Sequence, residues 1–375
     1  MTAILANGMR IAVERDGAGP PAYFVRYDVG TRDEPADRSG LAHLVEHLMW
    51  ENGRDGGLHA FLAGLGGFGN ATTYLDWTGY FAVLPLEGLE PALEMEAFRM
   101  RELPATEADL EREKRIIAAE SAVRLAERDF VEEELSRAAA FARGDPYGRS
   151  CLGSAEGLEA ATLREARRWH GEHYGPARAI LAVTGMVDAR SVLATVEGAF
   201  ATIEARKRPV RAEAGHPNAP VAGQTGGGRA VMAWRGPPDG DRGCDALDLA
   251  GGVLAAGRAC RLGRAGFDGW SFTLHRYAEA SLAVLALEGE GDLDALFCDP
   301  PDEAEVTRAR ELERLGDARQ HEDSGERAEL VAHAYAAGRS QGRLAARWDA
   351  CTTLDVTEAW QLLSGDPLVR FHLAA

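Results

Sequence analysis

Long apolar runs are missing from this 375-residue sequence. No stretch approaches the roughly 20 apolar residues that a membrane-spanning helix requires, so we expect no membrane association. The first eight residues, from Met1 to Gly8, contain neither a basic region nor an extended apolar run. They do not resemble a secretory signal, and we therefore expect a cytoplasmic protein.

Cysteine is scarce, and its spacing suggests no pairing. The five cysteines are an odd number and include no Cys-x-x-Cys pair. This pattern argues against a disulfide framework and against a zinc site made of cysteines. We expect the thiols to be reduced and mostly buried.

Basic residues are outnumbered by acidic ones. The 41 Lys and Arg residues face 59 Asp and Glu residues, which gives a formal net charge of −18. Because each neutralised phosphate requires a basic group, nucleic acids and anionic membranes are disfavoured as partners. The charge is compatible with a basic peptide substrate or a less acidic partner chain, although solubility is the simpler explanation.

The most informative segment that is present runs from Gly40 to Trp50. Its apolar residues recur at helical spacing, which predicts a helix. His43 and His47 then lie on one face, with Glu46 beside them. Two imidazoles one turn apart can share an ion about 2 Å away, as zinc requires, and the carboxylate can take a proton from a metal-bound water. The segment alone leaves open a plainer alternative, two core histidines and a surface glutamate.

The order His-x-x-Glu-His is the inverse of the commoner His-Glu-x-x-His signature and marks the inverzincins. With this motif, the sequence resembles the M16 metallopeptidase family, which includes pitrilysin, insulin-degrading enzyme and mitochondrial processing peptidase. The resemblance extends to the segments 5–10, 29–35, 145–153 and 168–176. It implies that His43 and His47 bind Zn²⁺ and that Glu46 is the catalytic base of a peptidase.

A long helix is predicted to begin after Thr106, a capping residue followed by acidic residues, and to continue as far as Phe141. Two zinc-binding histidines need a third protein ligand, and this helix contains the candidates. Glu113 and Glu120 are seven residues apart and therefore share one face. The resemblance implies that Glu120 is the third ligand and that Glu113 supports the site from behind the ligands. A solvated helix face is the alternative for each acid.

Residues 66–74 and 76–84 are predicted to form a pair of strands. The resemblance implies that the first strand is a sheet edge on which the substrate lies as an added strand, near Asn70 and Ala71. Backbone pairing of this kind holds an extended peptide largely regardless of its sequence. A plain edge strand with a glycine bend is the alternative.

The segment 205–228 is rich in Pro, Gly and charged residues, and we interpret it as a linker. It would separate an N-terminal domain, residues 1–204, from a C-terminal domain, residues 229–375, that is short for the family. The resemblance implies an α+β fold of two homologous α/β halves that enclose a chamber, each with a mixed or antiparallel sheet packed against helices.

Further elements are expected from local patterns in the two halves. In the first half, we expect strands within 4–14, 21–29 and 180–185, and helices within 59–64, 89–100 and 189–203. In the second half, we expect strands within 230–234 and 271–287, and helices within 246–256, 304–348 and 357–363.

Active family members usually supply an Arg and a Tyr from the second half, which hold the substrate carbonyl and stabilise the oxyanion. The matching region, residues 254–270, is short, and Trp270 occupies the tyrosine position. Arg264 could replace the arginine, with the indole N–H of Trp270 as a second donor. Alternatively, this half lacks such donors, and an M16-like partner chain in a homo- or heterodimer provides them.

The sequence therefore predicts a Zn²⁺-dependent endopeptidase that hydrolyses extended peptides or precursor segments. The main alternative is a non-catalytic M16-like subunit that acts in assembly or peptide binding. Such members usually have a broken zinc motif, whereas all the ligand positions and the base are present here. An unrelated metalloenzyme would require the flanking similarity to be chance.

Overall fold

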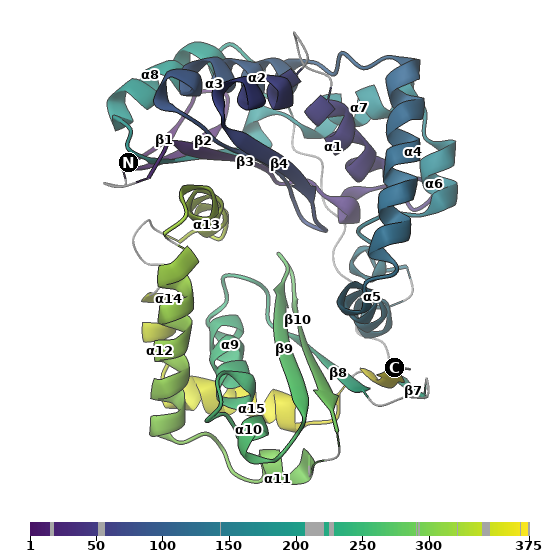
Figure 1. The fold of residues 1–375 in the computed structure, drawn as a ribbon, viewed down its shortest axis with the longest axis vertical. Coiled ribbons are helices and arrows are strands. Elements are labelled where there is room, and N and C mark those ends of the chain that lie inside the picture. The colour runs from purple at the N-terminus through teal and green to yellow at the C-terminus, as the bar shows by residue number, and fades with distance from the viewer. Residues whose placement is uncertain are drawn as a thin grey trace. The chain divides into compact units, whose positions relative to one another are not determined.

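The computed structural model describes residues 1–15, 19–51, 57–142, 144–206, 221–224, 229–289, 291, 293–320, 322–339, 346–367 and 369–373. These residues form two compact units, each built around one sheet (Figure 1). The first unit comprises Met1–Arg124, Ser150–Ala212 and Gln320–Gln341. The second comprises Leu125–Arg149, Glu213–Arg319 and Gly342–Ala375.

The sheet of the first unit has six strands in the order β1-β2-β6-β3-β5-β4. The strands are β1 (Thr2–Ile4), β2 (Arg10–Arg15), β3 (Ala22–Tyr27), β4 (Phe68–Thr73), β5 (Thr78–Val83) and β6 (Ala179–Gly185). β2 and β6 are parallel, and the other neighbouring strands are antiparallel. β6 is buried at every residue, as expected for a strand covered on both faces. β4 forms one edge of the sheet.

The helices of the first unit flank both faces of this sheet. They are α1 (Leu41–Glu51), α2 (Gly57–Leu65), α3 (Leu86–Arg101), α4 (Glu107–Arg124), α6 (Ala155–Ala160), α7 (Leu163–His173), α8 (Ala189–Phe200) and α13 (Ser324–Ala336). Alternate residues of the central strands enter two different cores. Tyr23 and Leu181 pack with α1, α3, α7 and α8, whereas Phe24 and Ala182 pack with α13.

The second unit contains a five-stranded sheet in the order β7-β11-β8-β10-β9. Its strands are β7 (Val221–Gln224), β8 (Arg229–Gly236), β9 (Gly269–Arg276), β10 (Ser281–Glu288) and β11 (Val369–Leu373). Its helices are α5 (Arg128–Ala140), α9 (Arg242–Ala255), α10 (Arg261–Arg264), α11 (Leu293–Phe297), α12 (Glu303–Gln320), α14 (Ala346–Asp349) and α15 (Thr353–Ser364). The α+β architecture of two sheet-and-helix units agrees with the prediction.

The two units do not coincide with the predicted domains 1–204 and 229–375, because each unit includes a segment from the other predicted domain. Helix α5 packs on β8 and β10 in the second unit, and helix α13 packs on β3 and β6 in the first. Within the predicted linker, Val221–Gln224 forms strand β7, while residues 207–220 and 225–228 lie outside the described residues. Strand partners and packing faces are contributed by distant segments, which local composition does not reveal.

The prediction of one helix from Thr106 to Phe141 is wrong. Helix α4 ends at Arg124, and α5 begins at Arg128. The two helices belong to different compact units. Because the intervening residues have no strong breaker, the helical pattern of the sequence does not show where the chain leaves one core for the other.

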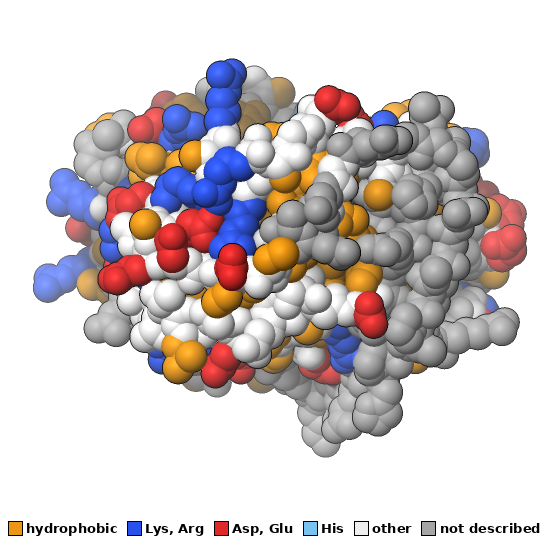
Figure 2. Space-filling view, turned by 90° about the horizontal axis from the view of Figure 1, so that it is seen from below, with side chains coloured by type: hydrophobic (Ala, Val, Ile, Leu, Met, Phe, Trp, Pro, Cys, Tyr) orange, Lys and Arg blue, Asp and Glu red, His pale blue; other side chains and the backbone are white. Residues whose placement is uncertain are grey.

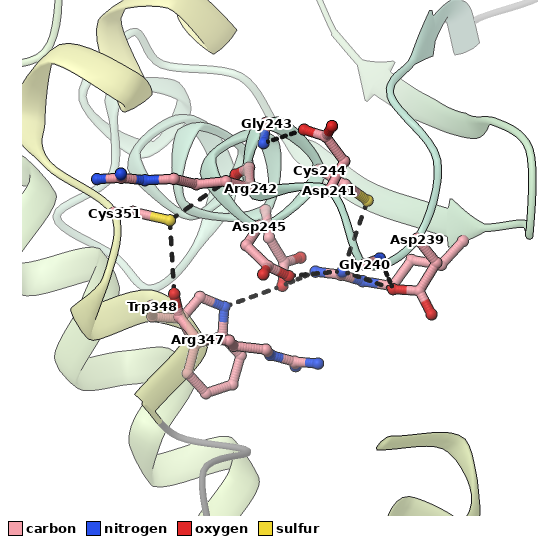
Figure 3. A network of polar contacts seen from close by, with 12 residues as sticks. Asp239, Gly240, Asp241, Arg242, Gly243, Cys244, Asp245, Arg347, Trp348 and Cys351 are labelled. Carbon is pink, nitrogen blue, oxygen red and sulfur yellow. Dashed lines mark hydrogen bonds and ion pairs between the residues drawn. The ribbon is translucent and has the colours of Figure 1, made fainter. Parts of the chain in front are cut away.

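An ionic network ties α9, β9 and α14 together in the second unit (Figure 3). The guanidinium of Arg276 donates to Asp245 at 2.9 Å and to Asp248 at 2.8 Å. Asp248 also accepts a hydrogen bond of 3.2 Å from the indole N–H of Trp348. These side chains are largely removed from solvent, so their charges are matched by direct contacts, as buried charges require.

Cys244, Cys260 and Cys351 are buried, in agreement with the prediction that most of the thiols are buried. Among the described residues, no helix combines the length and the apolar character needed to cross a bilayer. On the face shown in Figure 2, basic side chains lie beside acidic ones. The described part of that face therefore does not present charge of a single sign.

Candidate metal centre

The N-terminus of helix α1 is closed by a residue that lies outside the helix. The carboxylate of Glu34 accepts hydrogen bonds from the backbone N–H groups of Gly40, at 2.9 Å, and Ala42, at 2.7 Å. Gly40 has a φ of +105°, which side chains strongly disfavour. A Cβ on Gly153 would lie 2.2 Å from the Cα of Gly40. Backbone packing and a buried carboxylate thus hold the start of the helix in place.

We expect Glu34→Ala to lower the free energy of unfolding by about 2 kcal/mol or more. A helix N-cap contributes about 0.5–2 kcal/mol, and a buried N–H without a partner costs about 1–3 kcal/mol. Urea unfolding measures the change. Glu90→Ala is the matched control, because it removes an exposed glutamate in α3. Equal stability of the two variants would show that Glu34 does not anchor α1.

Helices α1 and α4 bring three candidate ligand atoms together. The Nε2 atoms of His43 and His47 are 3.2 Å apart. The Oε2 atom of Glu120 lies 3.7 Å from Nε2 of His43 and 3.5 Å from Nε2 of His47. Atoms about 2.0–2.1 Å from a tetrahedral zinc ion are separated by about 3.3–3.4 Å. The triangle therefore has the size that three zinc ligands require.

The chemistry of these atoms also fits zinc. Two imidazole nitrogens and one carboxylate oxygen form the donor set of a catalytic zinc site with a fourth position open. Burial and the nearby His47 lower the pKa of His43 to about 4, so His43 is neutral at pH 7, which is the state that binds metals. His43, His47 and Glu120 are the candidate metal-binding group among the described residues.

Glu113 orients His47 from the opposite side of its ring. Its Oε2 atom lies 3.2 Å from Nδ1 of His47, and its Oε1 atom accepts a 2.9 Å hydrogen bond from Arg112. Although burial lowers the pKa of His47, the hydrogen bonds to Glu113 and Glu120 outweigh that effect and raise it to about 10. The negative potential of these carboxylates favours a cation at the centre.

Glu46 lies beside the triangle without joining it. Its carboxylate is buried and accepts a 2.6 Å hydrogen bond from the hydroxyl of Thr73. Burial raises the pKa of Glu46 to about 7, although His47 and the hydrogen bond from Thr73 oppose this rise. A carboxyl group with such a pKa can exchange protons near neutral pH. Thr73 is the last residue of β4, so the edge strand ends at this carboxylate.

The edge strand β4 contains Asn70 and Ala71, which are predicted to lie beside a bound peptide. It pairs with β5 on one side, where Asn70 lies opposite Phe81 and Ala71 opposite Tyr80. Asn70 is exposed, whereas Ala71 packs against the core that contains α1. Helix α1 contacts both β4 and α4 and lies between them in Figure 1. Asn70 and Ala71 are thus on the sheet edge nearest the candidate metal centre.

Arg264 and Trp270 lie in the second unit. The guanidinium of Arg264 forms an ion pair with Glu305. The indole N–H of Trp270 donates a 2.9 Å hydrogen bond to the carbonyl of Ala255. The single donor of Trp270 is therefore engaged within its own unit, and the role assigned to this pair stays a prediction.

Sequence reasoning missed two residues that shape the centre, Glu34 and Thr73. Glu34 acts from outside the helix, six residues before Gly40, and Thr73 reaches Glu46 from another element. A buried glutamate before a helix is a weak capping signal. The Thr-x-x-Glu spacing that normally predicts a capping box is absent at this helix start.

A His-His-Glu centre with an adjacent buried glutamate, carried by an α+β unit, is a metallopeptidase-type site. Family models agree with this classification. The model described as Insulinase (Peptidase family M16) matches residues 11–155, and the model described as Peptidase M16 inactive domain matches residues 160–282. The chain belongs to the M16 peptidase family, as the sequence resemblance predicted.

Curated relatives have names of the same kind. An uncharacterized zinc protease of Mycobacterium leprae is 28% identical over 260 residues, covering 68% of this chain and 56% of that protein. A zinc protease of Helicobacter pylori is 27% identical over 50% of this chain and 44% of its own length. A probable mitochondrial-processing peptidase subunit beta of Arabidopsis thaliana is 28% identical over 52% of this chain and 38% of its own length. The chain spans about half the length of the curated relatives it matches.

Solved structures support the fold. A protease from Helicobacter pylori superposes with a TM-score of 0.85 at 19% identity, covering 100% of this chain and 99% of that chain. A peptidase M16 inactive domain from Pseudomonas fluorescens superposes with a TM-score of 0.82 at 15% identity, covering 100% of this chain and 98% of that chain. The two-unit M16 architecture is therefore shared along the whole chain.

Proposed function

We propose that this protein is a zinc-dependent endopeptidase that cleaves extended peptides or precursor segments. The observation that carries the proposal is the triangle of His43 Nε2, His47 Nε2 and Glu120 Oε2, with edges of 3.2–3.7 Å, beside the carboxylate of Glu46. Zinc held by these atoms supplies Lewis-acid activation of water and of a peptide carbonyl. The names of the M16 relatives support the same class of reaction.

The chain's own residues would perform four tasks. The free edge of β4 would hold the peptide as an added strand, by backbone hydrogen bonds. Glu46 would accept a proton from the attacking water and return it to the leaving amine. Thr73 would keep the Glu46 carboxylate in place through its 2.6 Å hydrogen bond. Glu113 would hold the ring of His47 in one orientation.

A partner chain forms part of the proposal. The engagement of the single donor of Trp270 with Ala255 supports an arrangement in which another M16-like chain supplies the oxyanion donors. Each such donor contributes about 3–4 kcal/mol to catalysis. A dimer with a second copy or with a different M16-like chain would satisfy this need.

A cytoplasmic location also stays a prediction.

The proposal is tested with the purified chain, its metal content and a mixed peptide library. We expect about one zinc ion per chain and cleavage that a chelator abolishes and added zinc restores. Zinc binding without cleavage, unchanged by any M16-like protein that co-purifies, would instead favour the non-catalytic subunit. Cleavage that survives complete removal of the metal would contradict the proposed centre.

A further inference from the structure

Helix α4 carries an exposed apolar stripe directly beside Glu120. Ile116, Ala119 and Val123 are exposed, with 45% of Ile116 and 62% of Val123 accessible. Their spacing places them on neighbouring turns of one side of the helix. Single exposed apolar residues are ordinary, but a contiguous stripe indicates a surface that contacts something apolar.

The stripe lies on the exposed side of helix α4, next to Glu120. At about 100° per residue, Ile116 and Val123 lie about 40–60° from Glu120 around the helix, on the side away from the buried Ile117. Glu120 is therefore at the boundary between the core face and the stripe. Its carboxylate contacts the histidines while the stripe next to it faces outward.

Glu120, which neighbours the stripe, is the most exposed residue of the candidate metal centre. The side chain of Glu120 is 42% exposed, compared with 9% for His43 and 16% for His47. A peptide that approaches the centre past the exposed Glu120 would pass along α4. The stripe spans about 10 Å along the helix, which equals the length of about three residues of an extended peptide.

We infer that Ile116, Ala119 and Val123 form a specificity surface for an apolar side chain next to the scissile bond. This inference rests on the proposed peptidase function and adds a substrate class to it. An apolar side chain that packs on the stripe loses contact with water, whereas a charged or strongly polar side chain would be desolvated without a partner. The enzyme would therefore cleave beside residues such as Leu or Phe in preference to Ser or Asp.

The test compares the parent with Ile116→Ser/Val123→Ser on two matched peptide sets, which carry either Leu or Ser next to the cleaved bond. We expect the double variant to lose the preference for Leu by about 10-fold in kcat/KM, with zinc content unchanged. Ile116→Leu/Val123→Ile should retain the preference. Leu86→Ser/Met186→Ser, which alters two exposed apolar residues elsewhere in the first unit, should behave like the parent.

The possible outcomes separate this inference from the proposed function. A parent chain that cleaves neither peptide set, alone or with a partner, contradicts the proposed function. A parent that cleaves both sets while the double variant keeps the same ratio contradicts the specificity surface. A double variant with an unchanged ratio and an altered oligomeric state would assign the stripe to a protein interface and overturn the inference.

Discussion

Glu46→Gln is expected to abolish peptide cleavage while leaving zinc binding unchanged. The glutamine has the same shape, and its amide oxygen can still accept the hydrogen bond from Thr73. It cannot accept a proton from water. Because a positioned general base contributes roughly 10²–10⁴-fold to a reaction, kcat should fall by at least about 100-fold. Steady-state kinetics and metal analysis on the same sample measure both quantities.

Controls for this variant must separate chemistry from structure. Glu90→Gln, an exposed position in α3, should cleave at the parental rate. The unfolding temperature of Glu46→Gln should match that of the parent, because the substitution keeps the size and shape of the side chain. Retained activity would overturn the assignment of Glu46 as the base. Loss of activity together with loss of zinc would show that Glu46 supports the metal centre.

Glu120→Ala is expected to weaken zinc binding severely without unfolding the chain. Glu120 supplies one corner of the ligand triangle and is the most exposed of its three residues. The loss of a ligand should exceed the roughly 10–100-fold loss of affinity that follows removal of an outer partner. Competition with a chelator of known affinity measures the change, and thermal unfolding without metal checks the fold.

Two further variants of helix α4 provide a scale against which the effect of Glu120→Ala on zinc affinity is compared. Glu113→Gln removes the charge behind His47, and it should weaken zinc binding by about 10–100-fold. Glu111→Ala, an exposed residue on the same helix, should leave the affinity unchanged. If Glu120→Ala bound zinc as tightly as Glu111→Ala, Glu120 would not be a ligand. The order Glu111, Glu113, Glu120 in increasing effect would support the proposed roles.

The sequence contained enough information to identify the family and the helical part of the centre. The His-x-x-Glu-His pattern lies on one helix, so the spacing of 3.6 residues per turn alone puts His43 and His47 on one face. Strong local patterns also located β4, β5 and β6 and most of the helices. The break between α4 and α5 and the strands β7 and β11 escaped prediction, because each depends on pairing or packing with residues far along the chain.

The sequence by itself predicted the type of the candidate metal centre, since the motif and its residue chemistry are local properties. Only the tertiary structure decided which groups complete and support it. Glu120 reaches the histidines because α4 packs against α1, and Thr73 reaches Glu46 because β4 ends there. The packing of α13 on the first sheet likewise joins residues distant in sequence. Such contacts are set by the burial of apolar faces, which brings remote segments together without a local signal.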